Sequence, residues 1–202
     1  MAGRRRQTPS QTVGPFFAYG LTPAQYGYPF KSLVTPDLAG DAVEGERMRL
    51  IGRVLDGDDK PITDAMVEIW QANAHGRYSG SSSAGTGDNR IDPDFTGFGR
   101  AGTGTDPEAR FIFDTVKPGA PGDGQAPHLN VVLTMRGLLN HLYTRIYFDD
   151  ETEANAGDPV LARVPENRHA TLLARRTPSS GGVVYHIDIC MQGPNETVFF
   201  DV

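Results

Sequence analysis

Leu50-Ile51-Gly52-Arg53-Val54 and Val67-Glu68-Ile69-Trp70 are two apolar runs on either side of the polar segment Asp56-Gly57-Asp58-Asp59-Lys60-Pro61. This pattern predicts a strand, a turn and a second strand. The second run continues into Gln71-Ala72-Asn73-Ala74-His75-Gly76-Arg77-Tyr78, so a His and a Tyr follow an apolar strand in a glycine-containing loop. A loop on a rigid sheet can carry a functional site, although Tyr and His at strand ends are more often satisfied edge residues.

Further apolar runs predict an all-β domain. We expect strands at Met48–Leu55, Met66–Trp70, Arg110–Lys117, His128–Arg136, Leu142–Asp149, Val183–Gln192 and Thr197–Val202. Alternation directs Leu50 and Tyr185 to the core and leaves Cys190 on the opposite face as an inert thiol. Residues 79–89, 94–106 and 121–127 read as loops, and 158–176 reads as a helical region in two pieces broken by Pro165. The predicted fold is a mainly β sandwich with long loops and minor helix.

Composition narrows the function classes. A chain of 202 residues with 24 Gly and 15 Pro suits one turn-rich β domain. The net charge of −6 argues against a nucleic-acid surface, and we interpret Arg4-Arg5-Arg6 as a solvated tail. The single cysteine excludes an internal disulfide, and the absence of an apolar signal core leads us to expect a cytoplasmic protein with no membrane contact.

Residues 1–47 form a segment that we expect to behave as an extended N-terminal arm, separate from a sandwich domain at 48–202. Aromatic residues gather here without a clean period, at Phe16, Phe17 and around Gly27 and Pro29. Such a segment cannot build its own core, so it should lie across its own domain or across a partner subunit.

The stretch His128-Leu129-Asn130 raises the question of a metal site. Side chains two positions apart on a strand point to one face and could share a metal ion. Here the second side chain is Asn130, a neutral oxygen donor that suits ferric iron poorly.

The stretch 50–78 resembles the signature of the intradiol ring-cleavage dioxygenases, ferric enzymes that open catechol rings between the two hydroxyls. The matching positions are Leu50, Gly52, Val54, Val67-Glu68-Ile69 and Gly76-Arg77-Tyr78. Asp59 departs from the signature, because the family usually has Gly or Ser at this position, but Asp also tolerates the unusual backbone angles of a turn. The resemblance runs from about Thr8 to Val202. Three further segments resemble a non-iron α chain of this family: Gln11–Phe17, Tyr147–Glu151 and Glu196–Val202.

The resemblance implies a defective iron site. Iron-bearing members use two Tyr and two His, with an Arg nearby. Tyr78 and His128 match the first Tyr and the first His, whereas Pro121, Asn130 and Gln125 stand at the other Tyr, the other His and the Arg. We therefore expect no iron in this chain and treat Tyr78 and His128 as remnant ligand positions. The remaining histidines are expected to be surface or structural: His75, His141, His169 and His186.

The resemblance also implies a supporting role beside an iron-bearing β chain, in αβ protomers of a larger oligomer. The partner would hold Fe(3+) and cleave 3,4-dihydroxybenzoate with O₂ to 3-carboxy-cis,cis-muconate, in aromatic catabolism. Substrate contacts carried over to this chain are Arg136, Thr12, Gly14 and Pro15. On a straight strand Arg136 lies roughly 26 Å from His128, so it should serve a neighbour's site.

Two other hypotheses remain open. The chain could be a stand-alone, non-catalytic module that holds an aromatic acid or has a structural role. It could also be an autonomous enzyme that uses Tyr78 and His128 with other ligands. Co-purification with a partner tests the first, and metal analysis of the chain alone tests the second.

Overall fold

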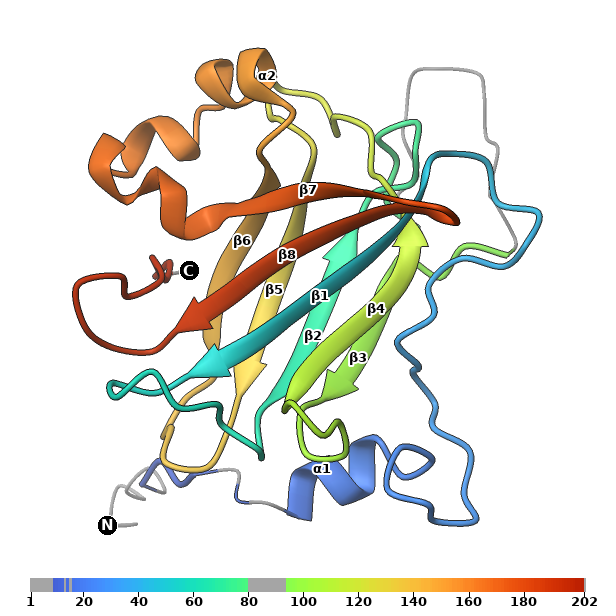
Figure 1. The fold of residues 1–202 in the computed structure, drawn as a ribbon, viewed down its shortest axis with the longest axis vertical. Coiled ribbons are helices and arrows are strands. Elements are labelled where there is room, and N and C mark those ends of the chain that lie inside the picture. Colours follow the sequence, from blue (N-terminus) through green and yellow to red (C-terminus); the bar gives the residue numbers. More distant parts are fainter. Residues whose placement is uncertain (1–8, 13, 15, 80–93, 202) are drawn as a thin grey trace, which may run out of the picture.

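The computed structural model describes residues 9–12, 14, 16–79 and 94–201. The chain folds into a mainly β sandwich (Figure 1), in which the described residues form an eight-stranded sheet of order β3-β2-β5-β6-β7-β8-β1-β4. The strands are β1 Arg47–Leu55, β2 Met66–Gln71, β3 Phe98–Gly102, β4 Arg110–Val116, β5 His128–Thr134, β6 Leu142–Phe148, β7 Leu173–Ser179 and β8 Gly182–Cys190. The helices are α1 Phe16–Leu21, α2 Thr152–Gly157 and two 3-10 segments, Leu161–Arg163 and Glu166–Leu172.

The sheet folds back on itself as two packed halves. β3, β2, β5 and β6 form one half, which is antiparallel, and β7, β8, β1 and β4 form the other, in which β8 and β1 are parallel. Only two residue pairs join β6 to β7. At the opposite seam, Leu38 N donates to the carbonyl oxygen of Asp114 in β4 (2.9 Å), and Leu38 O accepts from Thr96 N just before β3 (3.0 Å). A piece of the N-terminal segment therefore closes the gap between the two edge strands.

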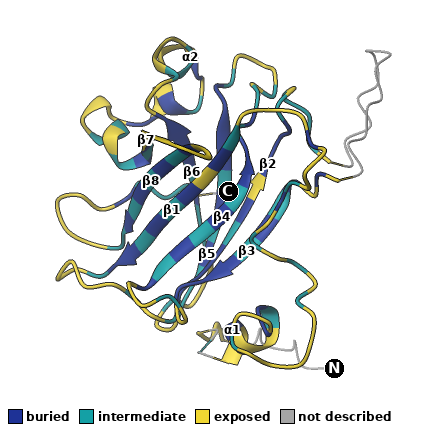
Figure 2. Cartoon of the chain, turned by 45° about the vertical axis from the view of Figure 1, so that its right-hand side comes forward, coloured by how far each residue is buried: buried dark blue, intermediate teal, exposed yellow. Residues whose placement is uncertain are grey.

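The core lies between the two halves and is built from alternate residues of each strand, which appear as buried bands along the sheet in Figure 2. Its large members include Leu50, Phe111, Phe113, Leu129, Leu133 and Tyr185. Gly52 interrupts this apolar series for a steric reason. A Cβ on Gly52 would lie 2.0 Å from the carbonyl oxygen of Ile187 on the neighbouring strand β8. The glycine that the family signature requires is therefore a close-approach position between β1 and β8.

A second apolar cluster lies under the helical segments that follow β6. It contains Ala126, Tyr147, Leu161, Val164 and Leu172. Asp158 is fully buried beside it and accepts hydrogen bonds from the Tyr147 hydroxyl (3.2 Å), Ala126 N (2.8 Å) and Leu161 N (2.7 Å). A buried carboxylate with this many donors ties the helical segment to the start of β5.

The predicted fold class and most predicted strands are confirmed, including the core-facing alternation of β1, β4, β5 and β8. Two predictions are wrong: residues 94–106 contain β3, and Thr197–Val202 makes only the isolated bridge of Phe200 to Tyr143 within its described residues. The region 158–176 has two helical pieces on either side of Pro165, as predicted, but it ends in β7. β3 contains two glycines and β7 is polar, so neither reads as a strand. Both are held in place by pairing with stronger neighbours, β2 and β8.

The N-terminal segment lies against the domain at the end of β3. Both polar atoms of the Gln25 side chain bond the backbone of Gly102, at 2.6 Å to its oxygen and 2.9 Å to its nitrogen. Large apolar side chains of this segment nevertheless face outward, with Phe16 80%, Phe30 67% and Leu33 99% exposed. Among the described residues, none of the helices has the length and apolar character needed to span a membrane.

Candidate functional site

The loop after β2 places Tyr78 beside the segment that follows β4. The side-chain oxygen of Asn73 accepts hydrogen bonds from two amides further along the loop, each at 3.0 Å. Gly76 has φ +76°, and a Cβ there would lie 2.0 Å from the Ala120 carbonyl oxygen. Only glycine allows this approach. As a consequence, Pro121, the position of the missing tyrosine, lies against the loop that carries Tyr78.

Tyr78 meets the start of β5 at two polar contacts. Its hydroxyl lies 3.3 Å from His128 Nε2 and accepts a hydrogen bond from Asn130 Nδ2 at 3.0 Å. The Tyr78 ring packs against Trp70, with ring centroids 4.5 Å apart. The structure thus brings together the two remnant ligand positions and the asparagine that replaces a third.

Burial sets the charge state of this cluster. His128 is 2% exposed, and its Nδ1 lies 2.8 Å from the Ala126 carbonyl oxygen, which fixes Nδ1 as the protonated nitrogen. Burial lowers the pKa of His128 to about 4, and the nearby Arg145 acts in the same direction. Burial also raises the pKa of Tyr78, while Asn130 and Arg145 oppose that shift. Near neutral pH both side chains are uncharged.

Arg145 supplies a positive charge close to these rings, and its effect on the pKa of His128 outweighs the opposing effect of the buried Asp158 carboxylate. It lies on β6 directly opposite Asn130 and donates from Nη1 to Gln125 Oε1 (2.9 Å) and to the Tyr147 hydroxyl (3.4 Å). Both acceptors are neutral, and no carboxylate of the described residues forms an ion pair with Arg145. The cluster therefore has a positive electrostatic bias.

These residues do not fit a ferric ion. Iron of this charge prefers several anionic or imidazole donors, and only Tyr78 and His128 are of those types here. The described residues contain no group of three or more His, Cys, Asp or Glu side chains arranged to hold a metal. Arg145 adds a cation whose field opposes metal binding. Family members depend on iron, but the absence of iron from this particular chain stays a prediction.

Arg136, the predicted substrate contact, lies at the other end of β5. Its Nε is 2.9 Å from Asp64 Oδ2, on the connection that precedes β2. The next residue, Gly137, donates its N–H to Thr12 Oγ1 at 2.9 Å. Two of the four predicted contact residues, Arg136 and Thr12, are therefore neighbours. Gly14 has φ +68° and open space around its Cα, while Pro15 lies outside the described residues.

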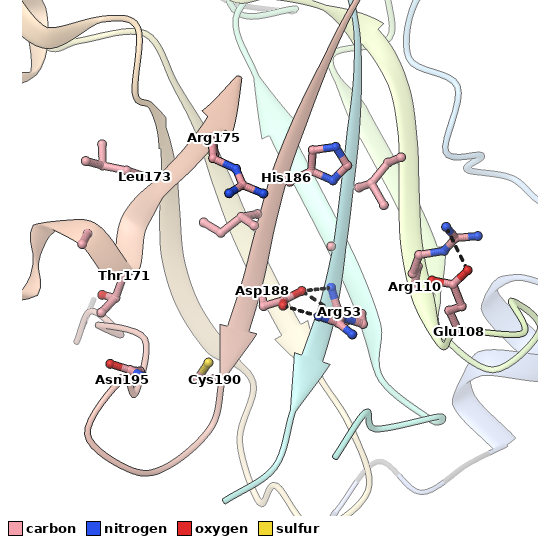
Figure 3. A pocket seen from close by; sticks show the side chains of 14 residues that line it. Arg53, Glu108, Arg110, Thr171, Leu173, Arg175, His186, Asp188, Cys190 and Asn195 are labelled. Carbon is pink, nitrogen blue, oxygen red and sulfur yellow. Dashed lines mark hydrogen bonds and ion pairs between the residues drawn. The ribbon is translucent and has the colours of Figure 1, made fainter. Parts of the chain in front are cut away.

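A separate cavity of about 630 Å³ lies on the outer face of β4, β1, β8 and β7 (Figure 3). Most charged side chains along it are already paired: Arg53 with Asp188 at 2.7 Å, and Arg110 with Glu108 at 3.5 Å. None of the predicted site residues lines this cavity. Its size alone does not make it the functional site.

The sequence did not single out Arg145 or Asp64. Arg145 could have been noticed as a cation on the alternate face of an otherwise apolar strand, opposite a proposed ligand. Asp64 follows a turn and has no sequence signal of its own. Its proximity to Arg136 arises from the antiparallel register that pairs Met66 with Thr134.

Comparison with known proteins places the chain among dioxygenases. A family model described as "Dioxygenase" matches residues 14–193. The chain is 54% identical over 198 residues to a protocatechuate 3,4-dioxygenase alpha chain of Burkholderia cepacia, covering 98% of each protein. It is 40% identical over 201 residues to the corresponding alpha chain of Pseudomonas putida, covering 96% of each.

A beta chain of the Burkholderia cepacia enzyme is also similar, at 35% identity over 176 residues, which covers 80% of this chain and 73% of that protein. Among solved structures, the 3-chlorocatechol 1,2-dioxygenase of Rhodococcus opacus 1CP superposes with a TM-score of 0.56 at 20% identity, covering 81% of this chain and 69% of the other. The structural match supports the shared fold.

Proposed function

The chain belongs to the dioxygenase family, among the intradiol ring-cleavage enzymes, and from this membership we propose that it is the non-iron α-type subunit of a two-chain enzyme. In that enzyme, an iron-bearing β-type chain cleaves 3,4-dihydroxybenzoate with O₂ to 3-carboxy-cis,cis-muconate. The bound ferric iron of the partner supplies the redox chemistry. This chain supplies surfaces and charges that orient the substrate. The same proposal places the αβ assembly, itself part of a larger oligomer, in the cytoplasm.

The observation that carries this proposal is the state of the remnant cluster. Tyr78 and His128 still converge, but Asn130 donates to the Tyr78 oxygen where a third metal donor would be needed, and Arg145 adds a positive charge. A chain built this way has lost metal chemistry while it keeps the fold. Its 54% identity with an alpha chain over nearly the whole length supports retention of the subunit role.

A second observation supports a role at a partner's site. The arm carries Thr12 to the Arg136 end of β5, far along the strand from the remnant cluster. Its exposed aromatic side chains, such as Phe16 and Phe30, form an apolar surface of the kind that protein interfaces cover. We propose that Thr12, Gly14, Pro15 and Arg136 wall the substrate site of the β-type chain, with the arm (residues 1–47) contacting that partner.

A stand-alone module that holds an aromatic acid is the alternative. The half-buried Arg145, which lacks a carboxylate partner among the described residues, is the feature that favours it. Co-expression separates the two functions. The subunit proposal expects this chain to co-purify with a β-type chain, with iron only in stoichiometry to that partner. Stoichiometric iron and ring cleavage by this chain alone would refute it.

Arg136→Ala in the assembled enzyme tests the role at the partner's site. A charge-assisted hydrogen bond to a substrate carboxylate contributes roughly 1.5–3 kcal/mol. We therefore expect kcat/KM for 3,4-dihydroxybenzoate to fall by about ten- to a hundredfold. Iron content and oligomer size should stay unchanged. Unaltered kinetics, or lost iron, would contradict the assignment.

A further inference from the structure

Asp64 and Arg136 are brought together by strand register. Asp64 lies two residues before Met66, the start of β2, and Arg136 lies two residues after Thr134, the end of β5. Met66 pairs directly with Thr134 in the antiparallel ladder, so the two flanking side chains emerge at the same edge. The Nε atom of Arg136 and the Oδ2 atom of Asp64 are 2.9 Å apart.

The two partners differ greatly in exposure. The Asp64 side chain is 16% exposed, whereas the Arg136 side chain is 66% exposed. Asp64 Oδ2 is buried and accepts no well-aligned hydrogen bond from the described residues, so the guanidinium is its charge partner. A buried carboxylate oxygen without a partner is costly, and this keeps the Arg136 side chain close to Asp64.

The atom used in this contact determines what Arg136 can still bind. The ion pair is made through Nε, on the side of the guanidinium. The terminal –NH₂ groups make no hydrogen bond or ion pair with another described residue. These groups form the edge that binds a carboxylate in a bidentate manner. Arg136 is thus anchored on one side and open on the other.

The backbone next to Arg136 is anchored as well. Gly137 has φ +94° and donates its N–H to Thr12 Oγ1 at 2.9 Å. Three segments distant in sequence therefore meet here: the arm, the β1–β2 connection and the β5–β6 turn. Because the Arg136 guanidinium is exposed, solvent screens its pairing with Asp64, so the pair stabilises the fold less than a fully buried pair would. Orientation of the side chain is the function that fits this arrangement.

We propose that Asp64 is a positioning residue for Arg136, and that it holds the guanidinium with its terminal edge presented to an anionic group of the substrate in the partner's site. This inference rests on the proposed function, because Arg136 must meet the substrate for its orientation to matter. Asp64 itself touches no substrate.

Two effects of Asp64 oppose each other. Its negative charge weakens the attraction of this region for an anionic substrate, so neutralising it should lower KM by about twofold through charge alone. Its contact with Nε removes rotamer freedom from Arg136, so its loss should weaken a geometry-dependent charge-assisted bond and raise KM by roughly three- to tenfold. The direction of the change in KM therefore decides which effect dominates.

The test uses Asp64→Asn in the assembled two-chain enzyme, because this change removes the charge with almost no change in volume. Asp58→Asn is the matched control. Asp58 lies on the same β1–β2 connection, pairs with Lys60 at 3.3 Å and has a side chain 78% exposed. Steady-state kinetics with 3,4-dihydroxybenzoate should show KM raised three- to tenfold for Asp64→Asn, with kcat within twofold, and no change for the control. Asp64→Glu should recover part of the loss.

A double-mutant cycle with Arg136→Ala separates positioning from structural damage. In the Arg136→Ala background, Asp64→Asn should have no further effect on KM. If the Asp64→Asn defect persists there, Asp64 acts on the structure and the proposal is wrong. If Arg136→Ala raises KM and Asp64→Asn does not, the positioning role is refuted and the subunit function stands. If Arg136→Ala itself leaves KM unchanged, the proposed role of Arg136 fails and the role of Asp64 fails with it.

Discussion

Acid should destabilise this chain through His128. The side chain is buried and uncharged, and burial, assisted by Arg145, lowers its pKa to about 4 from the usual 6.5. The unfolded chain therefore binds a proton at a higher pH than the folded chain does. By linkage, the stability that comes from keeping His128 neutral is complete above pH 6.5 and is lost as the pH falls from 6.5 toward 4.

The size of this effect follows from the shift in pKa. A difference of 2.5 units, from 6.5 to about 4, corresponds to roughly 3 kcal/mol when complete. At pH 5, about 2 kcal/mol of it should already be lost. Carboxylates add little in this window. Asp106, for example, has a pKa lowered to about 2 by its hydrogen bond with Arg110, so its contribution to the stability of the fold is lost only at lower pH.

Urea denaturation of the purified chain at pH 8 and pH 5 measures this loss. His128→Asn removes the titrating group and keeps an N–H donor near the Ala126 carbonyl. This variant should be less stable at pH 8 and should lose about 2 kcal/mol less than the wild type between the two pH values. His141→Asn, which removes an exposed histidine, is the control and should follow the wild type. Equal losses in wild type and His128→Asn would refute the reasoning.

Two further predictions concern packing and metal binding. Gly52→Ala should prevent stable folding and lower the free energy of unfolding by about 3 kcal/mol or more, because the new Cβ would overlap the Ile187 carbonyl oxygen. Circular dichroism of the purified variant checks this. The double variant Asn130→His/Pro121→Tyr should bind well below one equivalent of iron, as measured by elemental analysis. Adding Arg145→Ala should raise the iron content, because the guanidinium opposes the charge of the metal. Full iron occupancy with Arg145 still present would show that the charge is unimportant.

The strands in which apolar and polar residues alternate could be predicted from the sequence, because each of these strands has only one apolar face. β1 and β8 are examples, and their inner residues are buried as expected. β3 could not be predicted, since Gly99 and Gly102 give it little strand propensity. Its position depends on tertiary packing, because a Cβ on Gly99 would lie 2.4 Å from the Leu38 side chain. That contact joins residues far apart in the chain.

The candidate site was predictable only in part, for a similar reason. The signature residues Gly76 and Tyr78 and the strand residue His128 identify one cluster, and the structure brings Tyr78 and His128 together. The charge that dominates the cluster, Arg145, comes from a different strand, and the partner of Arg136 comes from a turn. Cross-strand neighbours of this kind depend on sheet register, which a single sequence does not reveal.

Under the proposed function, the two ends of β5 explain how one fold could lose metal chemistry and keep a substrate-binding role. His128 begins the strand in the remnant cluster, and Arg136 follows its end, roughly 26 Å away for a straight strand. The strand and its ladders with β2 and β6 form a rigid connection between the two ends. Changes at residues 121 and 130 can therefore remove metal donors, and a change at residue 125 the nearby arginine, without disturbing the contacts among Asp64, Arg136, Gly137 and Thr12. Separation along a rigid strand makes the two ends independent, and the proposed αβ enzyme would need only the Arg136 end from this chain.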